Sequence, residues 1–299
     1  MIRISNVTKS FDKKVAINNL SIDIEPGLYG LVGQNGAGKS TLFRLISGVY
    51  TANNGEILVD SFLSSTKQSK ERIFFLPDTP YAPNNADAKD TLMFYRLFYK
   101  IDETNFYNLV HLFNLPLLTK IRTYSKGMRR LLFIALALSV DCPILLLDEA
   151  FDGLDPLVLE TVKYQILKLY EDTSKTIIVS SHNISALEKL VDRFIVIHNG
   201  RLRDNGDIEH LGETFVKYQA IFTNSCSEEL LATHGLNVVS YRKIGSVINF
   251  VISQKTQLDI NEALNDLKPT LLEIVPIDAS EIIALQMMVA RKEQANENN

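Results

Sequence analysis

The sequence predicts an α/β protein with a strand-rich region near its start, an inserted helical segment and a small α+β domain at its end. Three observations lead to this fold class. Short apolar runs broken by turns fill the stretch from Ile2 to Leu63, which is typical of strands. The apolar spacing becomes helical from Thr91 to Leu118. Strands and helices then alternate from Ile144 to Val191, as in a parallel α/β unit.

The elements of the first domain follow from these patterns. Leu92, Tyr95 and Phe98 have helical spacing in the insertion. Residues 194–203 predict a hairpin, because Asn199 and Gly200 suit the two positive φ angles of a tight turn. We expect strands at Ile2–Ile4, Leu20–Ile24, Leu28–Val32, Glu56–Val59, Ile144–Leu147 and Thr176–Ser180, and helices at Pro156–Glu171 and near Ile184–Val191.

Beyond about Leu211 the pattern indicates a second domain with the element order βαββαβ, the order of ferredoxin-like domains, and a last helix. The predicted boundaries are 1–210 for the first domain, with its helical segment at about 88–140, then 211–293 for the second domain and 294–299 for a disordered polar tail. We expect strands at Tyr218–Thr223, Asn237–Tyr241, Val247–Ile252 and Leu271–Val275, and helices at Ser227–His234, Asp259–Leu267 and Ala279–Lys292.

Composition argues against several classes of protein. The chain has 31 Lys and Arg against 35 Asp and Glu, a net charge of -4, so it lacks the basic surplus that indicates a nucleic-acid partner. Cys142 and Cys226 lie far apart and in no metal-ligand or redox spacing, which indicates reduced thiols in a cytoplasm. The longest apolar run, Leu131–Val140, is far shorter than the roughly 20 residues of a spanning helix. We therefore expect a cytoplasmic chain that does not cross a membrane by itself.

A glycine-rich loop carries the clearest chemical signal. GQNGAGKS satisfies the pattern G-x-x-x-x-G-K-[ST], and its position between a predicted strand and an apolar-periodic segment argues against a chance match. Its glycines let successive backbone N–H groups point inward, which suits polyphosphate. We predict that it binds a nucleoside triphosphate, ATP, with Lys39 on the β- and γ-phosphates and Ser40 on Mg²⁺. The phosphate-binding residues are Gly33, Gln34, Asn35, Gly36, Ala37, Gly38, Lys39, Ser40 and Thr41.

Two carboxylates end the predicted strand Ile144–Leu147. We expect Asp148 to hold Mg²⁺ through water and Glu149 to polarise the water that attacks the γ-phosphate. Alone, such a pair also fits a surface loop or a helix cap. His182 follows the strand Thr176–Ser180, and parallel pairing would bring it beside Glu149, where it could hold the γ-phosphate and orient the water. Without that pairing His182 would be a turn or surface residue.

Ser125, in YSKGMRRLL, begins an apolar-faced helix whose first N–H groups favour an anion, although a capped core helix explains the pattern as well. With this segment, five motifs follow in order: GQNGAGKST, YSKGM, ILLLDEA, GLDP and SSHN. They resemble the Walker A, signature, Walker B, D-loop and switch-histidine motifs of the ATP-binding subunit of an ABC transporter. The resemblance covers roughly Met1–Gly206. It implies a P-loop NTPase core of the ABC ATPase type, with an antiparallel β subdomain and an inserted helical subdomain.

The resemblance also implies a shared site. It assigns Ser125 and Gly127 to the γ-phosphate of an ATP on a second subunit, and Lys126 and Met128 complete that signature. Two subunits would then enclose two ATP molecules. Asp155, in the D-loop, would contact the partner and also cap the following helix.

Phe11 falls where the family places an aromatic ring against adenine, a contact that suits any flat base. The alternative is that Phe11 is a core residue of a strand.

Two departures from the family pattern stand out. Asp78 occupies the loop position where the family usually has Gln, near metal or water. Its carboxylate could bind Mg²⁺ through water, yet it would repel the γ-phosphate if metal were absent. Lys126 and Met128 replace the common Gly and Gln of the signature, a form that resembles the subfamily of small ABC-2-type exporters, including peptide and antibiotic efflux systems.

The resemblance implies an ATPase subunit that drives a separate membrane permease, exporting peptide, antibiotic or similar amphipathic compounds. The helical insertion and the loop at residues 78–85 would grip the permease, at the inner face of the membrane. The second ATP-binding subunit would be an identical or a different chain, and no nucleic acid is expected. The main alternative is a non-transport ABC ATPase acting on DNA or ribosomes, but those relatives carry two cassettes or a long coiled coil, and this sequence shows neither. An unrelated phosphate-loop enzyme such as a kinase would not need YSKGM or His182.

Overall fold

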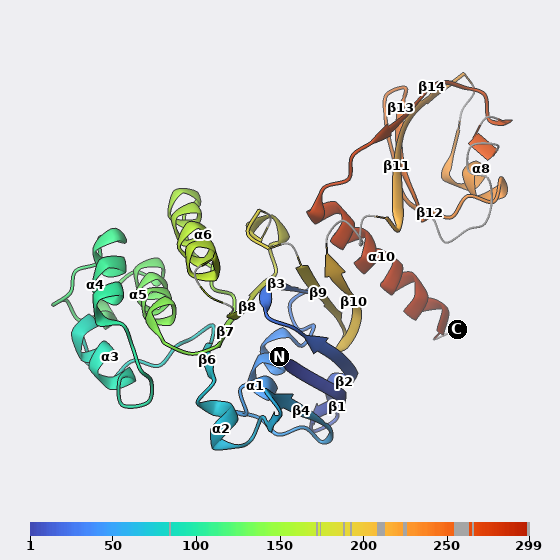
Figure 1. Cartoon of the computed structure of the whole chain (residues 1–299). Coiled ribbons are helices and arrows are strands. Elements are labelled where there is room, and N and C mark those ends of the chain that lie inside the picture. The colour runs from blue at the N-terminus through green and yellow to red at the C-terminus, as the bar shows by residue number, and fades with distance from the viewer. Residues whose placement is uncertain are drawn as a thin grey trace. The chain divides into compact units, whose positions relative to one another are not determined.

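The polypeptide divides into two units, Met1–Leu202 and Arg203–Asn299, and each has its own hydrophobic core. The structure is a computed structural model (Figure 1). The predicted domain boundary at residues 210–211 lies outside the described residues. The structure describes residues 1–83, 85–171, 173, 175–187, 189–191, 193–207, 213–223, 226–253, 263–264 and 266–297.

The first unit begins with an antiparallel sheet in the strand order β2-β1-β4-β5. Ile2 and Ile4 of β1 pair with Ile24 and Ile22 of β2, and all four side chains are buried in the core. The tip of this hairpin pairs Phe11 with a lysine, Lys14. The strands are β1 (Ile2–Phe11), β2 (Lys14–Ile24), β4 (Asn54–Val59) and β5 (Phe62–Leu63).

The predicted phosphate loop and the Asp148–Glu149 pair follow strands of the second sheet of this unit. Its strand order is β10-β9-β3-β8-β7-β6, and the β3–β8, β3–β9, β7–β8 and β6–β7 pairs are parallel. Every residue of β3, β7 and β8 is buried, which is typical of a parallel sheet covered on both faces. The strands are β3 (Gly27–Val32), β6 (Ile73–Leu76), β7 (Ile144–Leu147), β8 (Thr176–Ser181), β9 (Arg193–His198) and β10 (Arg201–Asp207).

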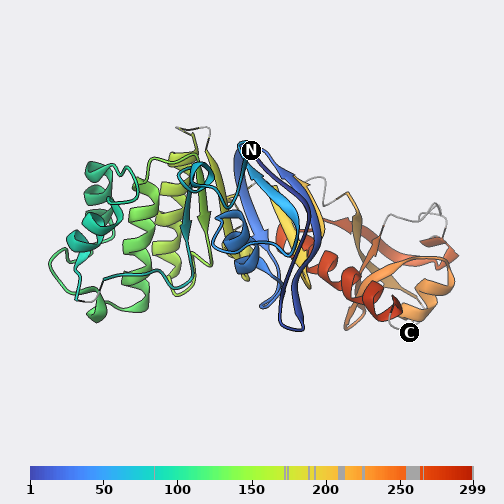
Figure 2. The ribbon, with the colours of Figure 1, turned by 90° about the horizontal axis from the view of Figure 1, so that it is seen from below.

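Three helices of the first unit lie together, away from its antiparallel sheet (Figures 1 and 2). Figures 1 and 2 show α3, α4 and α5 together on one side of the parallel strands and β1, β2 and β4 on the other. The helical insertion is therefore confirmed, and its bounds follow capping residues such as Asp87, Asp102 and Ser125. The helices are α1 (Lys39–Ile46), α2 (Lys67–Lys70), α3 (Ala88–Tyr95), α4 (Glu103–Leu112), η1 (Ile121–Thr123), α5 (Lys126–Ser139) and α6 (Pro156–Glu171).

The helix expected near Ile184–Val191 is wrong. The described residues there form only a short 3-10 helix, η2 (Ile184–Ala186), and then turns. Lys189 has φ 60°, a left-handed value that an α-helix cannot contain. The hairpin that follows is confirmed, because Asn199 and Gly200 have φ 47° and 74° between β9 and β10.

The second unit contains a four-stranded antiparallel sheet in the order β12-β13-β11-β14. The first and third strands along the chain, β11 and β13, lie in the middle, an arrangement that is consistent with the ferredoxin-like element order expected from the sequence. Tyr218 and Phe250 stack at 5.4 Å in its core. The expected helix Asp259–Leu267 lies largely outside the described residues. The elements are β11 (Phe215–Phe222), α8 (Glu228–Thr233), β12 (Val238–Ile244), β13 (Val247–Ser253), β14 (Pro269–Val275) and α10 (Ala279–Glu297).

The last helix is longer than expected. α10 continues to Glu297, so it includes described residues of the segment 294–299 for which a polar tail was expected. The segment after Ala279 contains neither Gly nor Pro, and Ala, Glu, Met and Gln, which favour helix, recur along it. Among the described residues, no helix combines the length and the apolar character needed to cross a membrane.

Candidate active site

The predicted phosphate loop joins β3 to α1, and its backbone geometry requires glycine. Gly38 has φ 113° and is the N-cap of α1, and a Cβ there would lie 2.7 Å from the Ala16 carbonyl oxygen. A Cβ at Gly33 would lie 2.5 Å from the carbonyl oxygen of Ile197. The neighbouring backbone therefore leaves no room for a side chain at Gly33 or Gly38.

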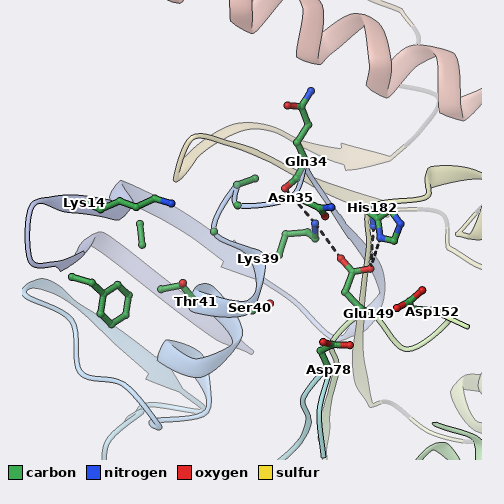
Figure 3. A pocket seen from close by; sticks show the side chains of 15 residues that line it. Lys14, Gln34, Asn35, Lys39, Ser40, Thr41, Asp78, Glu149, Asp152 and His182 are labelled. Atoms are coloured by element: carbon green, nitrogen blue, oxygen red, sulfur yellow. Dashed lines mark hydrogen bonds and ion pairs between the residues drawn. The ribbon is translucent and has the colours of Figure 1, made fainter. Parts of the chain in front are cut away.

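The loop borders a pocket of about 460 Å³. Glu149 and His182 reach it from the ends of β7 and β8, as the predicted parallel pairing requires. Figure 3 shows Glu149 between Lys39 and His182. Sequence reasoning did not single out three of the lining residues, Lys14, Ala16 and Asp152, although Lys14 lies near Phe11 in sequence. The other lining residues are Phe11, Gln34, Asn35, Gly36, Ala37, Gly38, Lys39, Ser40, Thr41, Asp78, Glu149 and His182.

Lys39 is held in an extended position across the loop. Its Nζ donates to the Gly33 carbonyl oxygen at 2.7 Å and lies 3.2 Å from Glu149 Oε1. Only 5% of its surface is exposed. A buried ammonium that is satisfied by two carbonyl oxygens, those of Gly33 and Gln34, and by one carboxylate provides a fixed positive charge at the pocket.

Glu149 is bound through both carboxylate oxygens. Oε2 accepts from the His182 backbone N–H at 3.3 Å and lies 2.9 Å from His182 Nδ1. Burial acts to raise the pKa of Glu149, but the His182 hydrogen bond and the Lys39 ammonium outweigh it, so the pKa lies below its usual value. The residue also has φ 47°, an unusual value that aims its side chain from the strand end. Glu149 is therefore an ionised carboxylate that can accept a hydrogen bond from water.

Asp148 is fully buried beside it. Ser180 Oγ donates to Asp148 Oδ1 at 2.7 Å and accepts from the Glu149 backbone N–H at 2.9 Å, so Ser180 fixes both acidic residues. Sequence reasoning missed this serine, although it stands two residues before His182. Asp148 Oδ2 has no hydrogen-bond partner in the described part of the chain. Because buried carboxylate oxygens normally have partners, this oxygen fits a water-bound Mg²⁺.

Asp78 follows β6 and lines the same pocket. Its Oδ1 accepts from Arg130 Nη2 at 2.7 Å, and the same nitrogen donates to the Asp78 carbonyl oxygen at 2.7 Å. Arg130 lies on α5 and was not singled out from the sequence. Nothing in the local sequence around Arg130 indicated that it pairs with Asp78, which lies 52 positions away in the chain.

The signature residues do not line the described pocket. Ser125 caps α5 by accepting from the Met128 backbone N–H at 3.1 Å, and Lys126 binds Asp152 at 2.5 Å. A Cβ on Gly127 would lie 3.0 Å from the Gly153 carbonyl oxygen, so the signature packs against the D-loop.

Asp155 is the N-cap of α6. Its Oδ1 accepts from the backbone N–H groups of Leu157 and Val158, both at 3.1 Å. The helix then begins with Pro156, a residue that suits the first helical position because it lacks an N–H group.

Phe11 is not a core residue, because 42% of its surface is exposed. Its ring meets Tyr50 edge-on at 5.3 Å and lies 5.2 Å from Lys9 Nζ. These contacts hold one edge of an aromatic ring that lines the pocket and leave it accessible to a flat ligand.

A phosphate loop with a bound lysine, a buried aspartate and an adjacent ionised glutamate define a P-loop ATPase. Comparison with known proteins narrows this class. The family described as "ABC transporter" matches residues 17–152. The bacitracin transport ATP-binding protein BcrA of Bacillus licheniformis is 30% identical over 224 residues, which cover 73% of this chain and 73% of that protein.

Two further similarities extend the comparison. The ABC transporter ATP-binding protein YtrB of Bacillus subtilis is 26% identical over 285 residues, 94% of this chain and 96% of that protein, so the match includes the second unit. A solved dimeric structure of MJ0796, a bacterial ABC transporter cassette, superposes with a TM-score of 0.62 at 22% identity, covering 69% of this chain and 98% of that chain.

The chain belongs to the family of ABC transporter ATP-binding proteins. The ABC ATPase fold implied by the sequence is thereby confirmed. The protein binds and hydrolyses ATP and drives a membrane permease, as the ATP-binding subunits of this family do when they dimerise beside their permease components.

Proposed function

We propose that this chain is the ATPase subunit of an exporter of peptide antibiotics or similar amphipathic compounds. The likeness to a bacitracin transport protein over 73% of both chains supports the substrate class. The mechanism is supported by the residues that line the pocket. The phosphate loop, Glu149 and His182 meet there, whereas the signature residues 125–128 do not line it. Such a pocket is half of a site that a second subunit completes.

Within one chain, each pocket residue has a distinct task. The N–H groups of residues 33–41 and the Lys39 ammonium hold the phosphates, and Phe11 stacks on adenine. Glu149 accepts a proton from the attacking water, and His182 holds Glu149 in place and contacts the γ-phosphate. Lys14 at the rim adds a second cation for the polyphosphate.

Magnesium fits this site. The unpartnered Asp148 Oδ2 would hold it through water, and the Ser40 hydroxyl would be a direct ligand. Asp78 is a weaker candidate, because Arg130 already occupies one of its carboxylate oxygens. When bound, the ion shields the negative charge of the phosphates.

The second subunit supplies the missing part of the site. Ser125, Lys126, Gly127 and Met128 of one chain contact the γ-phosphate on the other chain, and Asp155 lies at the interface. Ser125 is suited to this task because it exposes its hydroxyl at the N-terminus of α5, where free N–H groups attract anions. A second copy of this chain is the simplest partner, and a different ATP-binding subunit would serve in the same geometry.

The permease docks on the helical insertion, which places the protein at the cytoplasmic face of the membrane. Exposed apolar side chains gather there, and Tyr81 lies 5.5 Å from Phe94 between ring centres. A surface of this kind suits an apolar helix from a membrane protein. Its exposed members include Tyr81, Met93, Leu97, Phe98 and Leu118.

Reconstitution with the permease tests the proposal. The chain and its permease are purified together, placed in vesicles with ATP outside, and assayed for accumulation of a fluorescent peptide antibiotic inside. We expect transport with the wild type and none with Glu149→Gln. ATP hydrolysis without movement of any peptide antibiotic tried would exclude the proposed substrate class.

A further inference from the structure

Every carboxylate that lines the pocket has its own cation. Glu149 is paired with Lys39 at 3.2 Å, Asp152 with Lys126 at 2.5 Å, and Asp78 with Arg130 at 2.7 Å. A pocket for a polyphosphate that contains three carboxylates would otherwise repel its ligand. Figure 3 shows the Asp78 carboxylate below Glu149 and Asp152 in this pocket.

The Asp78–Arg130 pair differs from the other two in its burial. Arg130 is only 3% exposed, while the Asp78 side chain is 52% exposed. Burying a guanidinium is costly unless it is paired and hydrogen-bonded. The Arg130 guanidinium donates hydrogen bonds to three oxygens of the loop after β6. These are the carbonyl oxygens of Pro77 and Asp78 and one carboxylate oxygen of Asp78.

We propose that Arg130 is a positioning residue for ATP binding, whose guanidinium neutralises Asp78 so that an acidic side chain can stand beside the phosphates. The inference rests on the proposed function of the pocket. Arg130 reaches Asp78 from α5, so it also fixes the carboxylate to the helix that starts at the signature. Its charge also contributes to lowering the pKa of Asp152, after the larger effects of Lys126 and His182, so it acts on a second carboxylate of the pocket.

The neighbouring residue, Arg129, allows the effect of the Arg130 charge on Asp78 to be distinguished from its role in holding the loop in place. Arg129 Nη2 donates to the Pro80 carbonyl oxygen at 3.1 Å, so it holds the same loop but, in the described contacts, no carboxylate of the pocket. Arg129→Gln is therefore the matched control for Arg130→Gln. It loosens the loop and leaves the charge of Asp78 balanced.

The test measures ATP affinity of the full-length chain by calorimetry, with Mg²⁺ and again with a chelator. We expect Arg130→Gln to weaken metal-free ATP binding about tenfold, the scale of one uncompensated charge near the ligand. Mg-ATP should lose much less, because the ion offsets the exposed carboxylate. Arg129→Gln should lose no more than about twofold in either condition, and Asp78→Gln/Arg130→Gln together should restore the wild-type ratio of the two affinities.

Several outcomes would overturn the inference. An equal loss with and without Mg²⁺ would show a distorted loop, and unchanged affinity would show that the pair lies outside the ligand's field. Thermal unfolding shows whether Arg130→Gln folds. If it does not, the ATP affinity of Asp78→Gln alone tests the inference. That variant removes the carboxylate and keeps the guanidinium, so metal-free ATP should bind more tightly, and weaker binding contradicts the inference. In each case wild-type ATP binding and hydrolysis test the proposed function separately.

Discussion

Glu149 Oε2 lies 2.9 Å from His182 Nδ1, and this contact joins the ends of two neighbouring parallel strands. The other oxygen of Glu149 lies 3.2 Å from Lys39 Nζ, so the carboxylate connects the phosphate loop to the loop after β8. A ligand at the phosphate loop therefore meets a carboxylate whose orientation and ionisation are already fixed. Such preorganisation reduces the rearrangement needed at the moment of reaction.

Removing the charge of Glu149 should separate ATP binding from hydrolysis. Glu149→Gln keeps the shape of the side chain and cannot accept the proton of water, so we expect the rate of phosphate release to fall roughly 100-fold to 10,000-fold. ATP should still bind, and the closed dimer should accumulate because it no longer hydrolyses its ligand. Phosphate release and size-exclusion chromatography with Mg-ATP measure the two effects. Monomer with wild-type turnover would contradict the role of Glu149.

The lowered pKa of Glu149 predicts a pH-dependent stability. A carboxyl group whose pKa is lower in the folded chain stabilises the fold above its unfolded pKa, and this contribution is lost as the pH falls through the folded value. We expect the free energy of unfolding of the wild type, measured relative to Glu149→Gln, to decrease once the pH drops below the usual value of 4.5. Urea unfolding of both proteins over this range checks it. A difference that stays constant with pH would show that the carboxylate is not stabilised by His182 and Lys39.

The hairpin turn between β9 and β10 should support the phosphate loop. Gly200 has φ 74°, donates to the Ala37 carbonyl oxygen at 2.9 Å, and would place a Cβ 2.5 Å from the Ala16 carbonyl oxygen. Gly200→Ala must therefore displace the backbone of β2 at Ala16, which lines the pocket, and we expect weaker ATP binding together with at least about 2 kcal/mol lower stability.

Gly245 provides the matched control for this turn. It has φ 61° between β12 and β13, and a Cβ there meets no atom within 4 Å. Gly245→Ala should cost only the backbone strain, about 1 kcal/mol, and leave ATP affinity unchanged. Calorimetry and thermal unfolding compare the two variants. Equal effects on ATP affinity would exclude the support that we assign to Gly200.

Stacking on adenine predicts a loss of affinity rather than of turnover when Phe11 is truncated. Removing one aromatic contact to a base costs about 1–3 kcal/mol, so Phe11→Ala should raise the KM for ATP roughly 5-fold to 100-fold with little change in kcat. Phe11→Tyr should retain the wild-type KM. Phe62→Ala, at a partly exposed position of β5 outside the lining of the pocket, is the control. A fall in kcat at constant KM would argue against stacking.

The sequence predicted those parts of the fold that depend on local patterns. β7 and α6 begin and end where expected, because an apolar run and a Pro156 start are local signals. The segment after Ile184 has apolar residues at helical spacing as well, yet the left-handed backbone at Lys189 ends any helix there. Spacing alone does not reveal the φ that a residue adopts in its tertiary context.

Some residues of the candidate site could likewise be predicted from the sequence, and others could not. The phosphate loop is contiguous in sequence, so its residues could be named in advance, and the meeting of Glu149 with His182 followed from the parallel pairing of their strands. Ser180 and Arg130 were missed because their roles depend on partners that lie 32 and 52 positions away. Ordinary residue types carry no sequence signal of such long-range contacts.

A mixture of two inactive variants should test whether the site is shared. Lys39→Ala removes the phosphate contact of a chain's own pocket, and Ser125→Ala removes the signature contact offered to its partner. Each variant alone should be inactive as a dimer. In a mixed dimer, one pocket combines the intact Lys39 of one chain with the intact Ser125 of the other, so mixing should restore measurable ATP hydrolysis.

The control for this experiment addresses the second role of Ser125. Because its Oγ caps α5, Ser125→Ala should also cost about 1 kcal/mol of stability, which thermal unfolding measures. Ser227→Ala removes the equivalent cap of α8 and should lose similar stability while keeping full ATPase activity. No activity in the mixture of folded variants would contradict a site shared between two copies of this chain, and would favour a different chain as the natural partner.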